Sequence, residues 1–222
     1  MHRVQRCLLN IWTGKPVGDR YLLLPPIFDN GEFMNKELDD ALCAKYPKIF
    51  VERNLPMNQT CMCWGFDHGD GWYNIIDMLC SNIQHTIDQR IENNERDAKY
   101  VAMVRSAQSG DLTLFNDYYH WAANNEKTLE HYRDEVLKAD IGGVEFWRMP
   151  KEEIPQVVAE QIKEKYGTLR FYYRGGNEKI SGMVEMAESM SGVTCEVCGS
   201  VGKTRGGGWV RTLCDEHAES KV

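Results

Sequence analysis

The spacing of hydrophobic residues predicts three elements in the first part of the chain. A period near 3.6 after Asn35, a favourable N-cap residue, predicts a helix that Pro47 ends. Strict alternation predicts a strand over residues 60–66, and a second helical stripe predicts a helix from about Trp72. The apolar residues that carry these patterns are Leu38, Leu42 and Tyr46, then Met62, Trp64 and Phe66, then Ile75, Ile76, Leu79 and Ile83.

Helical spacing and strand-like alternation of apolar residues both occur again after residue 153. Apolar residues between Ile154 and Tyr166 follow helical spacing, and Gly167 is a residue that can end a helix in the left-handed conformation. Residues 169–173 alternate and predict a strand, and residues 180–190 predict an amphipathic helix.

Between these two parts the composition changes. Residues 86–140 are rich in charged and amide side chains, and Gly110-Asp111 and Asn124-Asn125 divide them into helix-sized pieces. We therefore expect an α+β fold with a small antiparallel sheet and packed helices. Its parts are a core made of residues 1–85 and 141–194, a helical insertion at 86–140, and a zinc-binding module at 195–222.

The C-terminal residues carry the clearest chemical signal. Cys195 and Cys198 form one close pair of potential metal ligands, and Cys214 and His217 form a second pair after an intervening hairpin-like segment. Two such pairs are what tetrahedral Zn²⁺ requires, and four protein ligands leave no open coordination position. We therefore expect one structural zinc ion in a treble-clef or zinc-ribbon module. The alternative is a set of unrelated buried cysteines beside a surface histidine.

A second group of potential ligands comprises Cys61, Cys63, His68 and Cys80. Its spacing matches no common zinc pattern. Buried thiols, which behave as small apolar side chains, explain these cysteines more simply than a second metal ion does.

A glycine-rich loop offers candidate acid–base chemistry. It contains Asp67, His68, Asp70 and Trp72 among glycines, and an Asp and a His side by side can exchange protons with a substrate. The alternative is that Asp70 caps the helix expected from Trp72. The sequence identifies no nucleophile or electrophile to complete a catalytic site.

A third group of candidate residues is basic and aromatic. Cations with an exposed ring can contact phosphate and stack on a base, whereas an ordinary solvated surface has the same composition. The residues are Lys203, Arg205, Trp209 and Arg211 in the expected hairpin, and Arg170 and Arg174 in the expected strand.

Charge and hydropathy narrow the classes of partner. The chain of 222 residues has a net charge of −7, and residues 1–150 hold 16 Lys and Arg against 22 Asp and Glu. A protein that wraps duplex nucleic acid usually has a basic excess, which is missing here. No segment has the ~20 apolar residues that span a bilayer, and the first residues lack the apolar core of a secretory signal. We therefore expect no membrane association and a cytoplasmic location.

Three segments together resemble a family of uncharacterised bacteriophage and prophage proteins. They are Cys63–Phe66 with Gly69–Tyr73, Gln161–Tyr172, and Cys195–His217 with its Gly208-Trp209. The resemblance implies a phage origin, and hence the cytoplasm of an infected host cell, and a zinc-stabilised α+β domain. It transfers no catalytic residues, and residues 86–140 fall outside it.

These observations favour a binding protein over an enzyme. We expect a phage accessory protein that binds a host or phage protein, including a component of a host defence system. One alternative is a nucleic-acid-binding accessory protein that uses the basic hairpin. The other is a hydrolase that uses Asp67, His68 and Asp70. The sequence does not specify the oligomeric state.

Overall fold

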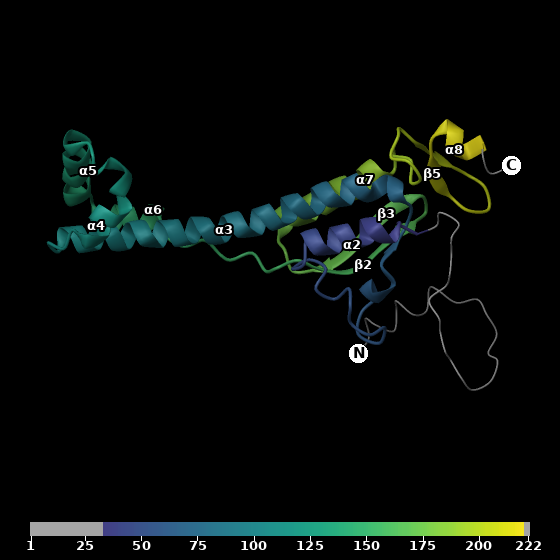
Figure 1. The fold of residues 1–222 in the computed structure, drawn as a ribbon, viewed down its shortest axis with the longest axis horizontal. Coiled ribbons are helices and arrows are strands. Elements are labelled where there is room, and N and C mark those ends of the chain that lie inside the picture. Colours follow the sequence, from purple (N-terminus) through teal and green to yellow (C-terminus); the bar gives the residue numbers. More distant parts are fainter. Residues whose placement is uncertain (1–32, 220–222) are drawn as a thin grey trace. The chain divides into compact units, whose positions relative to one another are not determined.

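The computed structural model describes residues 33–219 (Figure 1). The part of the α+β core that we assigned to residues 1–32 lies outside this range. The described residues form two compact units, one made of residues 33–86 together with 155–219, and one made of Ile87–Ile154. We call them the core unit and the helical unit. The predicted insertion boundary at residue 86 falls inside a continuous helix, α3 (Tyr73–Gln108).

The core unit is an α+β arrangement with two small sheets. Strands β1 (Phe66–Asp67), β2 (Val158–Lys165) and β3 (Thr168–Arg174) form one sheet in that order, and β4 (Lys203–Arg205) pairs with β5 (Arg211–Leu213) in the other. The first sheet is mixed, because β1 runs parallel to β2 while β2 and β3 are antiparallel. The prediction of an antiparallel sheet is therefore wrong for β1. The α-helices that the structure describes in this unit are α2 (Lys36–Lys45), the first part of α3, α7 (Glu178–Ser191) and α8 (Asp215–Glu219).

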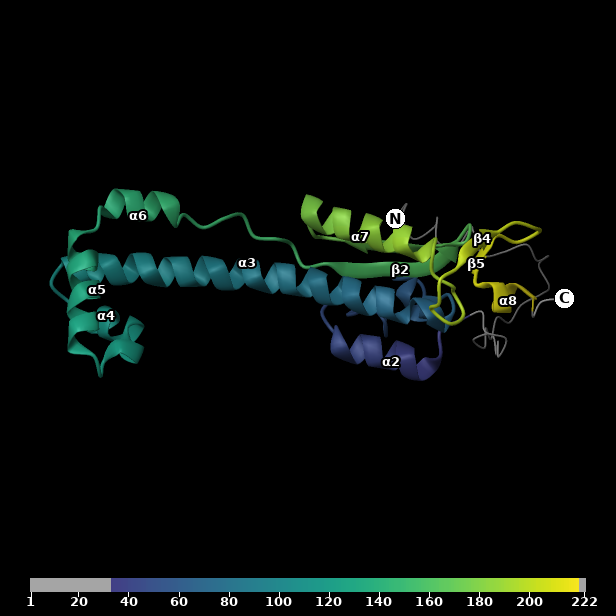
Figure 2. The same cartoon turned by 90° about the horizontal axis from the view of Figure 1, so that it is seen from above.

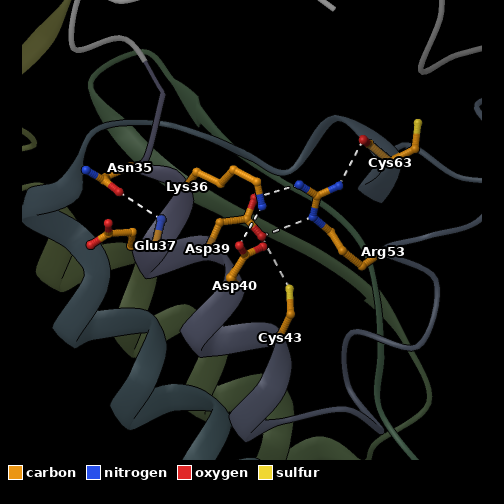
Figure 3. Close-up of polar contacts among 8 residues, drawn as sticks. All are labelled: Asn35, Lys36, Glu37, Asp39, Asp40, Cys43, Arg53 and Cys63. Carbon is orange, nitrogen blue, oxygen red and sulfur yellow. Dashed lines mark hydrogen bonds and ion pairs between the residues drawn. The ribbon is translucent and has the colours of Figure 1, made fainter.

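Two of the predicted helices are confirmed as α2 and α7. The Asn35 side chain caps α2 by accepting the backbone N–H of Glu37 at 2.8 Å, and α7 covers the predicted residues 180–190. Helix α2 is also attached to the following loop by a buried carboxylate, since Arg53 donates to both oxygens of Asp39 at 3.0 and 2.7 Å (Figure 3). Gly65 leaves room for this pair, because a Cβ there would lie 2.5 Å from Asp39 Oδ2.

The predicted strand over residues 60–66 is wrong for most of its length. Residues Met62–Trp64 form a 3₁₀ helix, and only Phe66–Asp67 are extended. Gly65 follows with a φ of 80°, and Arg53 donates to the Cys63 carbonyl at 3.0 Å, so this backbone is bonded to a side chain instead of a neighbouring strand.

The predicted helix over residues 154–166 is also wrong, because most of it is strand β2. Its buried residue Ile162 lies opposite Phe66 of β1 and Phe171 of β3. Gly167 does adopt the left-handed conformation, with a φ of 79°, but it does so beside Tyr166 in the two-residue turn of the β2–β3 hairpin. The predicted strand over residues 169–173 is confirmed as β3.

The helical unit consists of the rest of α3 with α4 (Thr113–Tyr118), α5 (Glu126–Lys138) and α6 (Ile141–Trp147), and a 3₁₀ turn at His120–Ala122. The helical pieces expected in this segment are therefore present. They surround a hydrophobic core of their own, formed by Met103, Val104, Ala107, Phe115, Tyr119 and Val136. Among the helices of residues 33–219, none is long and apolar enough to cross a membrane.

Candidate metal centre

The four predicted ligands converge at one end of the core unit. Their ligand atoms all lie within 4.8 Å of one another. The Sγ atoms of Cys198 and Cys214 are 3.8 Å apart, and His217 Nδ1 lies 3.7 Å from Cys195 Sγ and 3.1 Å from Cys214 Sγ. These four side chains can therefore bind a metal ion together.

Two local structures place the ligands. Cys195 and Cys198 lie on a tight turn, in which Gly199 has a φ of 77° and donates its N–H to the Cys195 carbonyl at 2.9 Å. Cys214 immediately precedes α8, whose first turn contains His217, as the i, i+3 spacing predicted. The predicted hairpin between the pairs is confirmed as β4 and β5, and Figure 2 shows these strands beside α8.

The turn also favours the form of cysteine that binds metals. Hydrogen bonds from the side chain and backbone of Ser200 lower the pKa of Cys198 to about 6. A thiolate is the form of cysteine that ligates a metal ion, so this environment prepares Cys198 for that role at neutral pH.

The Gly69–Trp72 loop packs directly on the cysteine turn. A Cβ on Gly71 would lie 2.1 Å from the Cys195 carbonyl oxygen and 2.5 Å from Gly199 N, so only glycine fits there. Gly71 N donates to the Glu196 carbonyl at 2.8 Å, and Trp72 Nε1 donates to the Thr194 carbonyl at 2.9 Å. The loop thus joins the start of α3 to the metal centre.

A second contact joins the β2–β3 hairpin to the same module. Thr212 Oγ1 donates to the Gly167 carbonyl at 2.6 Å. Beside it, Arg211 forms a buried ion pair with Glu196 at 2.9 Å, and the other oxygen of that carboxylate accepts the N–H of Gly69 at 3.3 Å. Sequence reasoning missed Glu196, although its position between the two cysteines of a metal-binding turn was a signal that it lies in a packed region.

The structure does not assemble Asp67, His68 and Asp70 into an acid–base site. His68 is wholly buried between the rings of Phe66 and Trp72, and its Nδ1 donates to the Gly69 carbonyl at 2.8 Å. Burial lowers the pKa of His68 to about 4, so the ring is neutral at physiological pH.

The cap predicted for Asp70 is wrong. The residue before the 3₁₀ turn Asp70–Trp72 is Gly69, and that turn has no side-chain cap. The Asp70 carboxylate instead accepts the backbone N–H of Asn35 at 2.6 Å, which connects the loop to the start of α2.

The basic residues singled out in the sequence are paired with carboxylates. Lys203 and Arg205 both contact Asp215, and Arg211 contacts Glu196. Arg170 lies near Glu188, and Arg174 contacts Glu52 and Glu160. Trp209, in the loop between β4 and β5, is 74% exposed.

Within residues 33–219, Cys61, Cys63, His68 and Cys80 do not converge as metal ligands. Cys63 and Cys80 are free thiols, as expected, but Cys61 is disulfide-bonded, so the thiol interpretation is wrong for that residue. In the part of the chain that the structure describes, the C-terminal cluster is the one group of three or more potential ligands that converges.

Comparison of the chain with protein-family models, with curated proteins and with solved structures found no match. The function is therefore inferred from the residues and their geometry.

Proposed function

We propose that this chain is a phage-type accessory protein that holds one structural Zn²⁺ ion and acts in the host cytoplasm by binding a partner protein. The metal part rests on the ligand geometry. Tetrahedral zinc with Zn–S bonds of about 2.3 Å places two ligating sulfurs ~3.8 Å apart. The distance between Cys198 and Cys214 is 3.8 Å. Four protein ligands fill the coordination sphere, which favours a structural ion.

The arrangement of the ligands favours a treble-clef type of module. One pair comes from a cysteine turn, a β-hairpin follows, and the second pair comes from the start of a helix. In this role the zinc ion holds the cysteine turn in the shape on which the Gly69–Trp72 loop packs. The metal then stabilises the core unit as a whole.

The observation that carries the binding function lies in the helical unit. Three large hydrophobic side chains at the end of α6 are exposed: Phe146 at 67%, Trp147 at 83% and Met149 at 64%. Together they present roughly 400 Å² of apolar surface, since one large aromatic side chain contributes about 150–250 Å². A patch of that size on a soluble protein often marks an interaction site.

The exposed side chains lie on a segment that is firmly attached to α3. Arg148, in the middle of the patch, turns inward to pair with Asp97 at 2.7 Å and to stack on Tyr100 at 3.8 Å. Asn94 exchanges two hydrogen bonds with the backbone of Lys151, at 2.8 and 3.0 Å. Because the segment is ordered before binding, a partner would gain contact area with little loss of conformational entropy.

Charge indicates the chemistry of that partner. Residues 87–154 hold nine Lys and Arg against fourteen Asp and Glu, a net charge of −5. Two copies of this unit would repel each other, whereas a basic surface would attract it. We therefore assign the patch to a host or phage protein that has an apolar pocket bordered by Lys and Arg. A component of a host defence system is one class of partner that fits a phage origin.

Affinity capture with matched variants tests this function. Full-length zinc-loaded protein is used to capture proteins from nuclease-treated lysates of infected and uninfected cells. A basic protein should be retained by the wild type and by Trp209→Ser, and lost with Trp147→Ser, because only the latter removes the centre of the patch. Equal capture by Trp147→Ser, or light scattering that shows self-association through the patch, would contradict the proposal.

A further inference from the structure

A second surface, on the core unit, combines exposed aromatic rings with lysines. We call it the Tyr166 surface; its residues are Lys163, Lys165, Tyr166, Tyr172 and Trp209. None of them belongs to the metal centre or to the patch on α6. Tyr166 and Trp209 are each 74% exposed, and Tyr172 is exposed as well.

Tyr166 has an unusual backbone for an aromatic residue. Its φ is 56°, which makes it the one non-glycine residue with positive φ among residues 33–219. Two-residue hairpin turns of this kind favour Asn, Asp or Gly, because a bulky side chain is strained in the left-handed region. The exposed ring gains little from packing in return. Strain of this kind at an exposed residue indicates a function for the side chain.

The rings and the cations lie close together. Lys163 and Lys165 project from the same face of β2, since they are two residues apart in a strand. Lys165 Nζ is 5.7 Å from the centre of the Tyr166 ring, and Lys163 Nζ is 5.6 Å from the centre of the Tyr172 ring.

The hairpin of the zinc module contacts the turn that carries Tyr166. A Cβ on Gly167, the partner of Tyr166 in the turn, would lie 3.2 Å from Val210 Cγ1. The turn is therefore in contact with the residue next to Trp209. Trp209, exposed in the loop between β4 and β5, is thus one residue from a contact with the turn that carries Tyr166.

The two lysines differ from the basic residues that are paired with carboxylates. Among the described residues, Lys163 and Lys165 form cation–π contacts and have no ion pair. The pKa of Lys163 is lowered, mainly by partial burial and to a smaller extent by the charge of Lys165. The charge of Asp67 acts in the other direction and raises it. An anion bound between the lysines would relieve their repulsion.

We infer that the Tyr166 surface binds single-stranded nucleic acid, with bases stacked on Tyr166, Tyr172 and Trp209 and phosphates bound by Lys163 and Lys165. Exposed rings beside cations are the usual means of binding single strands without sequence preference. Duplex DNA keeps its bases stacked internally and cannot use the rings. This activity is separate from binding of a partner protein through α6.

Fluorescence anisotropy tests this inference with zinc-loaded full-length protein. The probes are a labelled oligo-dT of about 20 nucleotides and a duplex of the same length. The wild type should bind the single strand more tightly than the duplex. Tyr166→Asn should weaken this binding about tenfold, since one stacking contact is lost. The same variant should melt at the wild-type temperature or above, because Asn tolerates the left-handed conformation. Lys163→Gln should weaken binding and reduce the salt slope by about 0.7.

Two control variants separate this surface from the alternatives. Trp147→Ser removes an exposed ring of the helical unit and should bind the single strand like the wild type. Arg205→Gln removes a hairpin cation that is paired with Asp215, and it should also bind like the wild type. The inference is overturned if the wild type does not bind the single strand at low salt, or if Tyr166→Asn binds it as tightly as the wild type. It is also overturned if Arg205→Gln is the variant that loses binding.

Discussion

Gly69 and Gly71 allow the main chain of the Gly69–Trp72 loop to contact the main chain of the cysteine turn, which is far away in sequence. The backbone of Gly71 does not need the left-handed conformation, so its importance comes from space alone. The cysteine turn occupies the position that a side chain would take, and a hydrogen bond from Gly71 N to the Glu196 carbonyl crosses the same contact.

Gly71→Ala should therefore separate the loop from the metal centre. The added methyl group would meet backbone atoms that cannot turn away, so we expect a loss of at least about 1–3 kcal/mol of stability, the typical cost of overpacking a core site. Chemical denaturation and zinc analysis measure the effect. Gly206→Ala is the matched control, because nothing lies within 4 Å of a Cβ there. Equal stability of the two variants would show that the loop does not pack on the turn.

A second prediction concerns how the stability of the folded protein depends on pH through His68. Its pKa is about 4 in the folded protein against 6.5 for an ordinary histidine, so the unfolded chain takes up the proton first as pH falls. The stability that neutral His68 contributes is complete above pH 6.5 and is lost as pH falls towards 4. Between pH 7.5 and 5 the loss is roughly 2 kcal/mol.

Urea denaturation of the wild type and His68→Leu at both pH values measures this contribution. Protonation of the metal ligands affects both proteins, so the difference between their pH dependences isolates His68. The variant should lose less stability than the wild type between the two values. An identical loss in both would mean that His68 is protonated equally in the folded and unfolded states.

At the scale of single residues, the metal ligands could be predicted from the sequence, but the side chains that pack around them could not. Cys195, Cys198, Cys214 and His217 are recognisable because each pair is close in the chain and the ligand types are specific. The contacts of Glu196 with Gly69 and Arg211 join segments far apart in sequence. No periodicity records such contacts, so only the structure reveals them.

At the scale of elements, strand β2 shows why a pattern can mislead. Its apolar residues fit a helical period because the strand contains a bulge between Ala159 and Gln161, which shifts the alternation by one residue. In addition, β1 and β3 supply its hydrogen-bonding partners, and the former lies some ninety residues earlier. Helices α2 and α7 were predictable because caps and apolar stripes are local.

Because the cysteine turn packs on the Gly69–Trp72 loop, loss of the metal ion should destabilise the core unit beyond the metal centre itself. Cys198→Ser or Cys214→Ser should lose the zinc ion, because each removes one of four ligands. Since the cysteine turn contacts Gly71 and Trp72, a strong chelator should lower the melting temperature of the core unit and change the Trp fluorescence. Metal analysis, thermal denaturation and fluorescence measure these effects.

Cys63→Ser is the matched control for the metal variants. Its side chain donates to the Thr60 carbonyl at 3.2 Å, and a hydroxyl can make the same hydrogen bond. This variant should keep a full zinc content. Zinc-free protein after mild purification, or full zinc in Cys198→Ser and Cys214→Ser, would contradict the assignment of the ligands.

At the scale of the whole molecule, each unit has its own hydrophobic core. Residues 87–154 enter and leave the core unit at neighbouring points, since Gln84 and Gln156 exchange side-chain hydrogen bonds at 3.0 and 3.3 Å. Replacing residues 87–154 with a short flexible linker should therefore leave a folded core unit that binds zinc, because loop-closure entropy changes slowly with length.

Circular dichroism, zinc analysis and thermal denaturation of the shortened protein measure this independence. Residues 87–154 expressed alone should form a folded helical protein, because their core is contributed from within. If the shortened protein is insoluble or melts without cooperativity, the two units depend on each other for folding.

The contact between Gly71 and the cysteine turn also sets an order of events during protein synthesis. Residues 33–86 emerge from the ribosome early, but the surface that completes them begins at Pro155 and includes Cys195 and Gly199. Translation adds about 5–20 residues per second, so the early segment waits several seconds for its partner. Residues 87–154 contain their whole core and can fold during that interval. The unit encoded in the middle of the chain is thus the first to be completed, and uptake of the metal ion is among the last steps of folding.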